Sequence, residues 1–272
     1  MFLVLTLLVP AVTVYADDWG MGQANARLPH PSMFRPVSTP AQDISTLAVF
    51  VLMVTTAIFV IVSALLTYSV IRFRARPGDG SEPPQLYGSA PVEFAWTAVP
   101  VLIVFVLILT TARSVYTVQA ARRPPRSVAV RVELTSADVV HSFWVPQLAG
   151  KTDVIPNKTN VTWIDPQEPG IFLGQCAEFC GTQHALMLLR VVVDPRDQWD
   201  RWVATQREVA IEDTSVASGR DVFASTACVN CHVVRGVGAN GRFGPDLTHL
   251  MSRETLAAGA ALNTTANLKA WI

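Results

Sequence analysis

Two long apolar runs, 46–71 and 94–112, constrain the fold of this chain more than any other feature. Neither run contains a charged residue, and each reaches the ~20 residues that a helix needs to cross a bilayer. Burial of both inside a soluble protein is the alternative, but neither run shows the polar stripe of such a helix. We therefore expect two transmembrane helices, at 46–71 and 94–117, joined by a loop at 72–93.

Arginines predict the orientation of these helices. Three of them follow the first run directly: Arg72, Arg74 and Arg76. By the positive-inside rule the 72–93 loop is cytoplasmic and the large C-terminal part is external. Three more follow the second run and oppose this orientation: Arg122, Arg123 and Arg126. Long translocated domains weaken such counts, so we keep the external placement.

The N-terminal segment 1–16 resembles a secretory signal, because its apolar run is too short to span and ends at a small residue, Ala16. It lacks a basic start, so a retained segment and a different start site both stay open. Segment 17–45 is expected to be external. The chain carries 21 basic and 21 acidic residues and therefore shows no charge excess typical of nucleic-acid binding.

Soft metal ligands cluster in the C-terminal half. Four of them fall within one short stretch, and a histidine lies upstream: Cys176, Cys180, His184, Met187 and His141. Thiolate and thioether favour Cu(I), while imidazole serves both copper oxidation states. One copper could be held by Cys, His and Met. Two cysteines in one loop can instead bridge two coppers, with a histidine on each, which suits rapid electron transfer.

This cluster has three other interpretations: a helix face, a disulfide and a zinc site. The spacing would place the four ligands on one face of a helix. However, Gly174, Gly181 and the β-branched run at 188–193 favour a loop between strands. A disulfide between the two cysteines would leave His184 and Met187 unexplained. A zinc site is disfavoured because methionine is a poor zinc ligand.

A second redox motif, Cys228-Val-Asn-Cys231-His232, is typical of covalent attachment of c-type haem. The two thiols form thioethers with the porphyrin, and the adjacent histidine is the proximal iron ligand. Half of a zinc site is the alternative, but the chain has only four cysteines and the other two belong to the copper cluster.

The copper motifs carry a family resemblance. Segment 138–146, followed by Cys-x-Glu-Phe-Cys-Gly-x-x-His-x-x-Met, resembles the dinuclear copper A domain of cytochrome c oxidase subunit II. The match includes Lys151, Asp153 and Pro156. The resemblance implies that both cysteines bridge the coppers and that three residues are terminal ligands: His141, His184 and Met187. It also implies that the Glu178 carbonyl is a ligand, with its carboxylate directed toward Mg²⁺ at subunit I.

Glu93 opens the second apolar run in a stretch resembling the family signature Glu-x-x-Trp-Thr-x-x-Pro. In that family this glutamate lies near the cytoplasmic entrance of a proton path. The alternative is a carboxylate at a helix start, which the helix dipole favours. Both interpretations stay open.

The segment after 218 resembles a class I cytochrome c. The resemblance implies that Gly219 and Phe223 pack helices, that the Pro245 carbonyl accepts from the proximal histidine, and that Arg253 lies near a propionate. Met251 is too near Pro245 in sequence to be the distal ligand. We expect a truncated domain that ends before the distal methionine and the C-terminal helix.

The remaining features predict local structure. Asp194 and Pro195 predict the start of a helix, with Asp194 as its N-cap and Pro195 in its first turn. Trp199 and Trp202 of this helix are interpreted as packing residues rather than as residues that carry electrons. His30 is expected at the surface, and His249 at the surface or in packing. The copper domain is expected to contain fewer strands than the domain of the family that it resembles. It is also expected to lack the aromatic residues through which electrons reach copper in that family, since no tryptophan lies between positions 96 and 144.

The predicted fold is a membrane α-hairpin, a β-sandwich cupredoxin-like copper domain and a small all-α cytochrome c domain. The remaining boundaries are 127–207 for the copper domain, 208–217 for a linker and 218–272 for the cytochrome domain.

The predicted function is electron transfer in a terminal, proton-pumping haem–copper oxidase, from haem c through dinuclear copper to subunit I, where oxygen is reduced. Implied partners are subunits I and III, the membrane, and cytochrome c or another donor. The implied location is a bacterial cell membrane, with both redox domains periplasmic. The alternatives are a membrane-anchored copper-delivery protein and a non-functional truncated fragment.

Overall fold

The computed structural model describes residues 31–74, 78, 85, 87–120 and 129–272. The described chain forms two compact units, Pro31–Glu168 and Pro169–Ile272. The predicted signal at 1–16, His30 and part of the 72–93 loop (75–77, 79–84 and 86) lie outside the described residues.

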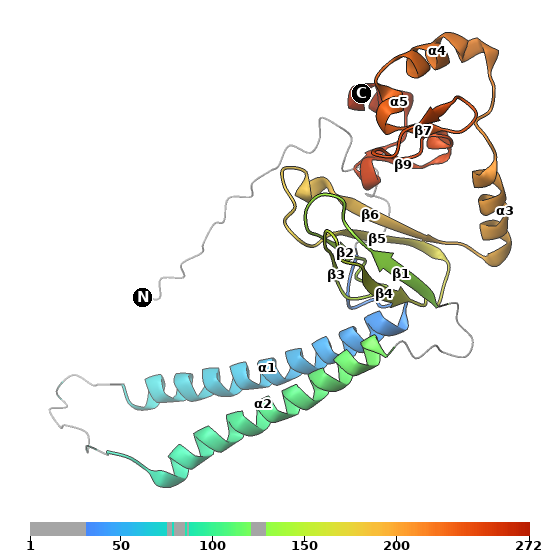
Figure 1. Cartoon of the computed structure of the whole chain (residues 1–272). Coiled ribbons are helices and arrows are strands. Elements are labelled where there is room, and N and C mark those ends of the chain that lie inside the picture. Colours follow the sequence, from blue (N-terminus) through green and yellow to red (C-terminus); the bar gives the residue numbers. More distant parts are fainter. Residues whose placement is uncertain (1–30, 75–77, 79–84, 86, 121–128) are drawn as a thin grey trace. The chain divides into compact units, whose positions relative to one another are not determined.

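Two long helices dominate the first unit. α1 spans Thr39–Arg72, α2 spans Ala90–Gln119, and they pack side by side (Figure 1). Each begins with a proline in its first turn, where the missing N–H costs no hydrogen bond. Both are long and apolar enough to cross a membrane, and their most apolar windows are not buried. This confirms the predicted hairpin, although both helices start before positions 46 and 94.

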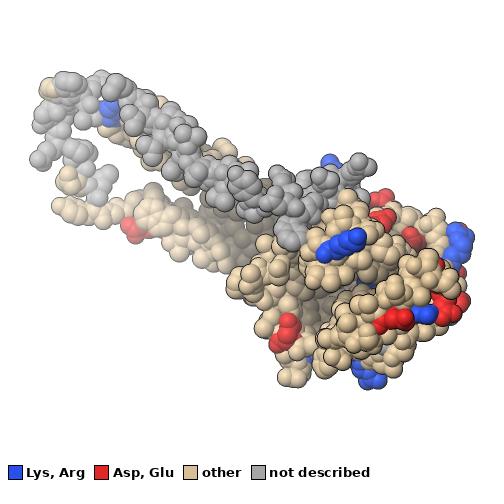
Figure 2. Space-filling view, turned by 90° about the horizontal axis from the view of Figure 1, so that it is seen from above, with Lys and Arg blue, Asp and Glu red and all other residues tan. Residues whose placement is uncertain are grey.

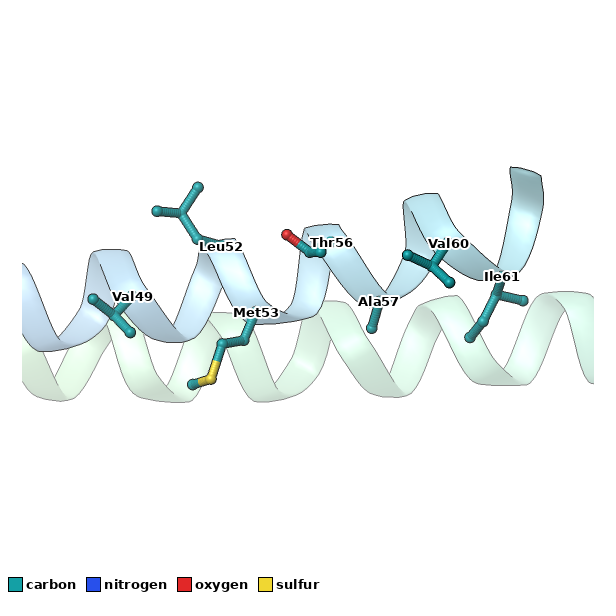
Figure 3. Close-up of a pocket in the computed structure, with 7 residues that line it drawn as sticks. All are labelled: Val49, Leu52, Met53, Thr56, Ala57, Val60 and Ile61. Carbon is teal, nitrogen blue, oxygen red and sulfur yellow. The ribbon is translucent and has the colours of Figure 1, made fainter. Parts of the chain in front are cut away.

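The surface of the helical hairpin is apolar. In the part that Figure 2 leaves uncovered, the hairpin is almost entirely tan, with few charged side chains. Seven α1 residues line a shallow apolar groove: Val49, Leu52, Met53, Thr56, Ala57, Val60 and Ile61 (Figure 3). Their spacing of three and four places them along one side of the helix, which suits lipid tails or another helix.

A buried carboxylate holds the start of α1. Asp165, which is fully buried, accepts hydrogen bonds of 2.7 Å from the Ser38 hydroxyl and from the Thr39 backbone N–H. At the end of α2, the Trp163 indole N–H donates to the Val118 carbonyl at 2.6 Å. These contacts connect both helices to the segment around β4.

Two antiparallel strand pairs complete the first unit. β1 (Val130–Leu134) pairs with β4 (Asn160–Ile164), with Val130 opposite Ile164. β2 (His141–Trp144) pairs with β3 (Thr152–Val154), with His141 opposite Val154. Val145 and Leu148, both fully buried, follow β2 and supply its core.

The second unit begins with an antiparallel hairpin. β5 (Gly170–Cys176) pairs with β6 (Leu188–Val193), and Gln175 lies opposite Leu188. The ligand motif occupies the connection, with a 3₁₀ turn at His184–Leu186. The prediction of a loop between strands, rather than a helix, is therefore confirmed.

α3 (Arg196–Arg207) follows this hairpin. Its N-cap is Pro195 and no side chain caps it, so the predicted capping by Asp194 is wrong. Trp199 and Trp202 stack on each other at 5.2 Å and stay about half exposed. They therefore pack mainly against one another rather than in a core.

The cytochrome-like region is built from short elements: α4 (Ala217–Ser225), α5 (Cys228–Cys231), β7 (Val233–Val234), β8 (Ala239–Asn240), β9 (Thr255–Leu256), β10 (Ala261–Leu262) and α6 (Thr265–Trp271). 3₁₀ turns lie at Thr214–Val216, Leu250–Ser252 and Ala257–Gly259. The two short strand pairs, β7–β8 and β9–β10, were not predicted.

The helix α6 was not predicted. The Thr264 hydroxyl accepts from the Asn267 N–H at 3.1 Å, which caps α6. The expected lack of the C-terminal helix that packs on Gly219 and Phe223 in the family stays a prediction. A Cβ at Gly219 would meet no described heavy atom within 4 Å, apart from atoms of its chain neighbours and of the backbone of its own helix. The predicted close packing at Gly219 is therefore not seen.

Candidate metal and haem sites

The β5–β6 connection brings four predicted copper ligands together. The Cys180 Sγ lies 3.7 Å from the Cys176 Sγ, 3.7 Å from the His184 Nδ1 and 3.9 Å from the Met187 Sδ. A disulfide has an S–S distance of ~2.0 Å, so the two cysteines are not bonded to each other. Four soft donors around one space fit a thiolate-rich copper site.

Backbone contacts hold this loop in shape. The Cys176 N–H donates to the Met187 carbonyl at 2.9 Å, which joins the two ends of the loop. The Glu178 carbonyl oxygen lies 3.1 Å from the Cys176 Sγ, so this oxygen faces the sulfur cluster. Gly181 has a φ of +126°, a conformation that glycine adopts without strain.

Burial differs sharply along the loop. Cys176 is only 4% exposed, whereas the Phe179 ring is 78% exposed. That ring meets the His184 imidazole edge-on, with 5.7 Å between the ring centres. The loop therefore presents one aromatic ring to solvent beside a ligand. Phe179 was not predicted as a site residue, although its place between the two cysteines is a usable signal.

His141 belongs to the Pro31–Glu168 unit and lies at the start of β2. Its Nε2 is 2.9 Å from the Asp138 carboxylate. Hydrogen bonds from His141 and then Ser136 lower the pKa of Asp138 to about 2. A carboxylate on one ring nitrogen orients the imidazole, so that the other nitrogen can ligate a metal. Ligation by His141 together with the loop residues stays a prediction.

A hollow of about 960 Å³ lies beside the Cys-x-x-Cys-His motif, a volume suited to a cofactor. Its walls include the predicted haem residues Cys228, His232, Pro245 and Arg253. α5 places both cysteines on one short helix, and both are exposed and unbonded to each other. No methionine is among the described lining residues, and Met251 is 60% exposed.

The predicted proximal histidine, His232, is held from two sides. The His232 Nδ1 lies 2.9 Å from the Pro245 carbonyl, so an N–H there donates to it and Nε2 is left for iron. Gly244 lies against the same ring, because a Cβ at that position would be 2.5 Å from the His232 Cε1. The Gly244 N–H also donates to the Cys231 carbonyl at 2.7 Å. A side chain at position 244 would therefore require the His232 ring to shift.

Two further predicted residues have defined contacts. Arg253 donates to the Asp246 carbonyl. The His249 Nε2 lies 3.0 Å from the Glu208 carbonyl, which fits the packing interpretation. Nearby, the Ala210 N–H donates to the Arg235 carbonyl at 2.9 Å. The predicted linker at 208–217 is therefore held against the cytochrome-like region at its start.

Glu93 lies in the first turns of α2. Its Oε1 accepts a 3.2 Å hydrogen bond from the Ser89 backbone N–H. This contact satisfies a donor at the helix start, as expected of a capping carboxylate. The geometry favours the capping interpretation over the proton-path interpretation.

Family models match three segments of the chain. They describe cytochrome c oxidase subunit II, transmembrane domain, at residues 28–113; its periplasmic domain, at 106–194; and cytochrome c, at 216–272.

Two relatives agree with these matches. The chain is 31% identical to cytochrome c oxidase subunit 2 of Alkalihalophilus pseudofirmus, over 87% of this chain and 80% of that protein. It is 29% identical to the protein of the same name from Bacillus sp. strain PS3, over 74% and 70%. A crystal structure of the periplasmic domain of subunit II of cytochrome oxidase from Bradyrhizobium japonicum is 40% identical, covering 28% of this chain and 56% of that one, with a TM-score of 0.28.

Proposed function

Since the chain belongs to the cytochrome c oxidase subunit II family, and is therefore a membrane-anchored electron-transfer subunit of a haem–copper oxidase, we propose that it holds a dinuclear copper centre and a covalently bound haem c. One observation carries the copper proposal. Four soft donors surround one space in the β5–β6 connection without a disulfide.

In this proposal the loop residues have distinct roles. Cys176 and Cys180 bridge two coppers as thiolates, while His184 and Met187 bind one metal each. His141, oriented by Asp138, and the Glu178 carbonyl complete the set. When bound, the copper pair supplies a one-electron acceptor that shares its charge between two metals. The Glu178 carboxylate is a hard oxygen donor suited to Mg²⁺ at the boundary with subunit I.

The proposed haem residues also have distinct roles. Cys228 and Cys231 form the thioethers, His232 ligates the iron through Nε2, and Pro245 fixes the orientation of that ring. Arg253 is available to a propionate at the edge of the hollow. When bound, haem c supplies a one-electron couple between an external donor and the copper pair.

We further propose a bacterial cell-membrane location with the 72–93 loop cytoplasmic and both redox domains periplasmic. Subunits I and III and cytochrome c, or a similar donor, are the proposed partners. Tyr87→Cys, at a fully exposed position, should resist an impermeant thiol reagent in intact cells, whereas Lys158→Cys, also exposed, should react. The opposite pattern would refute this orientation.

Proton uptake through Glu93 stays a prediction, and capping is the favoured role. Glu93→Ala should slow turnover of the assembled oxidase if the carboxylate carries protons. Unchanged turnover, with both redox centres still reduced normally, would establish the capping role.

The decisive experiment measures copper and the oxidised-state EPR spectrum of the purified complex. We expect two coppers per chain and a delocalised mixed-valence signal, both lost in Cys176→Ser and Cys180→Ser, because a hydroxyl cannot replace a bridging thiolate. Ser142→Ala, near the site in sequence but outside the ligand set, is the control. One copper per chain without haem would favour copper delivery, and zinc at full occupancy would refute the copper proposal.

A further inference from the structure

The cytochrome-like region contacts the strand that leaves the copper loop. The 3₁₀ turn Ala257–Gly259 lies against β6. Three apolar residues of this region are well buried, and all flank that turn: Leu256, Ala260 and Ala261, at 6%, 2% and 7% exposure. The most buried apolar side chains described in this region thus lie at this contact, and Leu256 also lines the haem hollow.

Arg190 of β6 makes the polar part of the contact. Its guanidinium donates to the Glu254 carboxylate at 2.8 Å and to the Thr255 hydroxyl at 3.3 Å. The Arg190 side chain is only 13% exposed, whereas Glu254 is 68% exposed. A shielded arginine with two fixed acceptors gives a directional contact, unlike a loose surface ion pair.

The aliphatic part of the Arg190 side chain is packed as well. Gly259 has a φ of +95°, and a Cβ there would lie 3.4 Å from the Arg190 Cδ and 3.6 Å from the Leu188 Cβ. Next to it, Gln183 and Leu186 of the copper loop share a hollow with Ala260 and Trp271. The copper loop and its outgoing strand therefore both face the cytochrome-like region.

The same arginine borders the haem hollow. Arg190 lines it together with Cys228 and His232. Met187 directly precedes β6, and the three residues from Met187 to Arg190 cover about 10 Å of extended strand. One short strand therefore links a proposed copper ligand to a wall of the proposed haem site.

We propose that Arg190 is a positioning residue that locks the cytochrome-like region onto β6, and thereby sets the rate of electron transfer from haem to copper within this chain. The inference rests on the proposed function. The step moves one electron from ferrous iron at His232 to the oxidised copper pair at Cys176 and Cys180. No bond forms or breaks.

Arg190→Gln in the purified oxidase complex tests this. A photoactivated one-electron reductant first reduces the haem, and the rate of copper reduction is then followed optically. We expect that rate to fall about tenfold, the effect of losing a hydrogen bond to a charged group. Haem content, copper content and both reduction potentials should stay unchanged. Arg196→Gln, which breaks the exposed Arg196–Asp200 pair, is the matched control.

Two further variants separate docking from misfolding. Glu254→Gln changes only the exposed partner and should slow transfer in the same direction. The exchanged pair Arg190→Glu with Glu254→Arg should recover part of the rate. Independently of the cofactors, amide hydrogen exchange at 254–261 should rise in Arg190→Gln and not in Arg196→Gln.

The outcomes distinguish the two proposals. Normal transfer in Arg190→Gln and Glu254→Gln, with both cofactors present, would overturn the positioning role and leave the proposed function intact. Absence of copper or haem from the unsubstituted protein would overturn the proposed function itself. Slow transfer with altered potentials would also contradict the positioning role, because the substitution would then act on the cofactors.

Discussion

The copper loop and the haem motif lie in the same unit but are built in opposite ways. The copper loop joins two paired strands, and Cys176 at its start is buried. The haem motif lies on a single helical turn with both cysteines exposed, beside an open hollow. The protein alone brings four proposed copper ligands together, and we expect the haem region to depend on its proposed cofactor for a core. The predictions below test this contrast.

The largest expected effect comes from removing each cofactor in turn. The double variant Cys228→Ala/Cys231→Ala cannot attach haem. Amide exchange in its α4 and α5 should approach that of an unfolded segment, since no described residue of these two helices is buried by the protein itself. Without copper, in Cys176→Ser, the β5 and β6 amides should stay protected by their strand pairing. Hydrogen exchange with mass spectrometry measures both. Equal loss of protection in the two variants would refute the contrast.

A second test concerns the one preformed part of the haem site. Gly244→Ala places a methyl group 2.5 Å from the His232 ring and should displace it, at a cost of about 1–3 kcal/mol for an overpacked site. Gly219→Ala is the control, because its Cβ meets open space in helix α4 and should stabilise by ~0.5–1 kcal/mol. Denaturation of the haem-bound protein measures both, and equal stabilities would show that the ring has room to move.

Local patterns predicted much of this molecule. The apolar runs, the strand after Met187 and the two cysteine motifs are signals carried by neighbouring residues, and the family resemblance supplied the chemistry. Secondary structure was predicted best where a long run was uniformly apolar, as in α1 and α2. Weak local signals failed. Pro195 rather than Asp194 is the N-cap of α3, and α6 was not predicted although Thr264 is a good N-cap.

Long-range contacts could not be predicted from the sequence. Asp165 caps α1 from 126 positions away, and Arg190 meets Glu254 from 64 positions away. Neither pair carries a spacing signal, because tertiary packing alone brings the partners together. The role of Asp138 was missed for a different reason. It was visible in the motif, but its orienting bond to His141 depends on how the chain turns before β2.

The third prediction returns to the copper loop. If the loop is preformed, loss of its weakest ligand should tune the site rather than destroy it. Met187→Leu keeps the volume and should retain two coppers per chain, with a measurable shift in reduction potential. Redox titration of the EPR signal provides the measurement. Loss of copper would show that the thioether is needed for binding and that the loop is less preformed than the geometry indicates.

The smallest effect concerns acid stability next to the haem site. Hydrogen bonding from Thr248, aided by the charges of Arg235 and Arg253, holds the pKa of Asp246 below its ordinary value near 3.8. A carboxylate with a lowered folded pKa stabilises the fold at pH values above its unfolded pKa, and that contribution disappears as the pH falls through the folded pKa.

Asp246→Asn should therefore lower the free energy of unfolding slightly at neutral pH and flatten its decline below pH ~4. Asp221→Asn, on the exposed face of α4 in the same region, should change neither. Chemical denaturation between pH 3 and pH 7 compares the unsubstituted protein with the two variants. If the free energy of unfolding depends on pH in the same way in all three, Asp246 does not contribute to acid stability. Such a small effect is expected because Asp246 is solvated, whereas the most buried apolar side chains described in this region lie at its contact with β6.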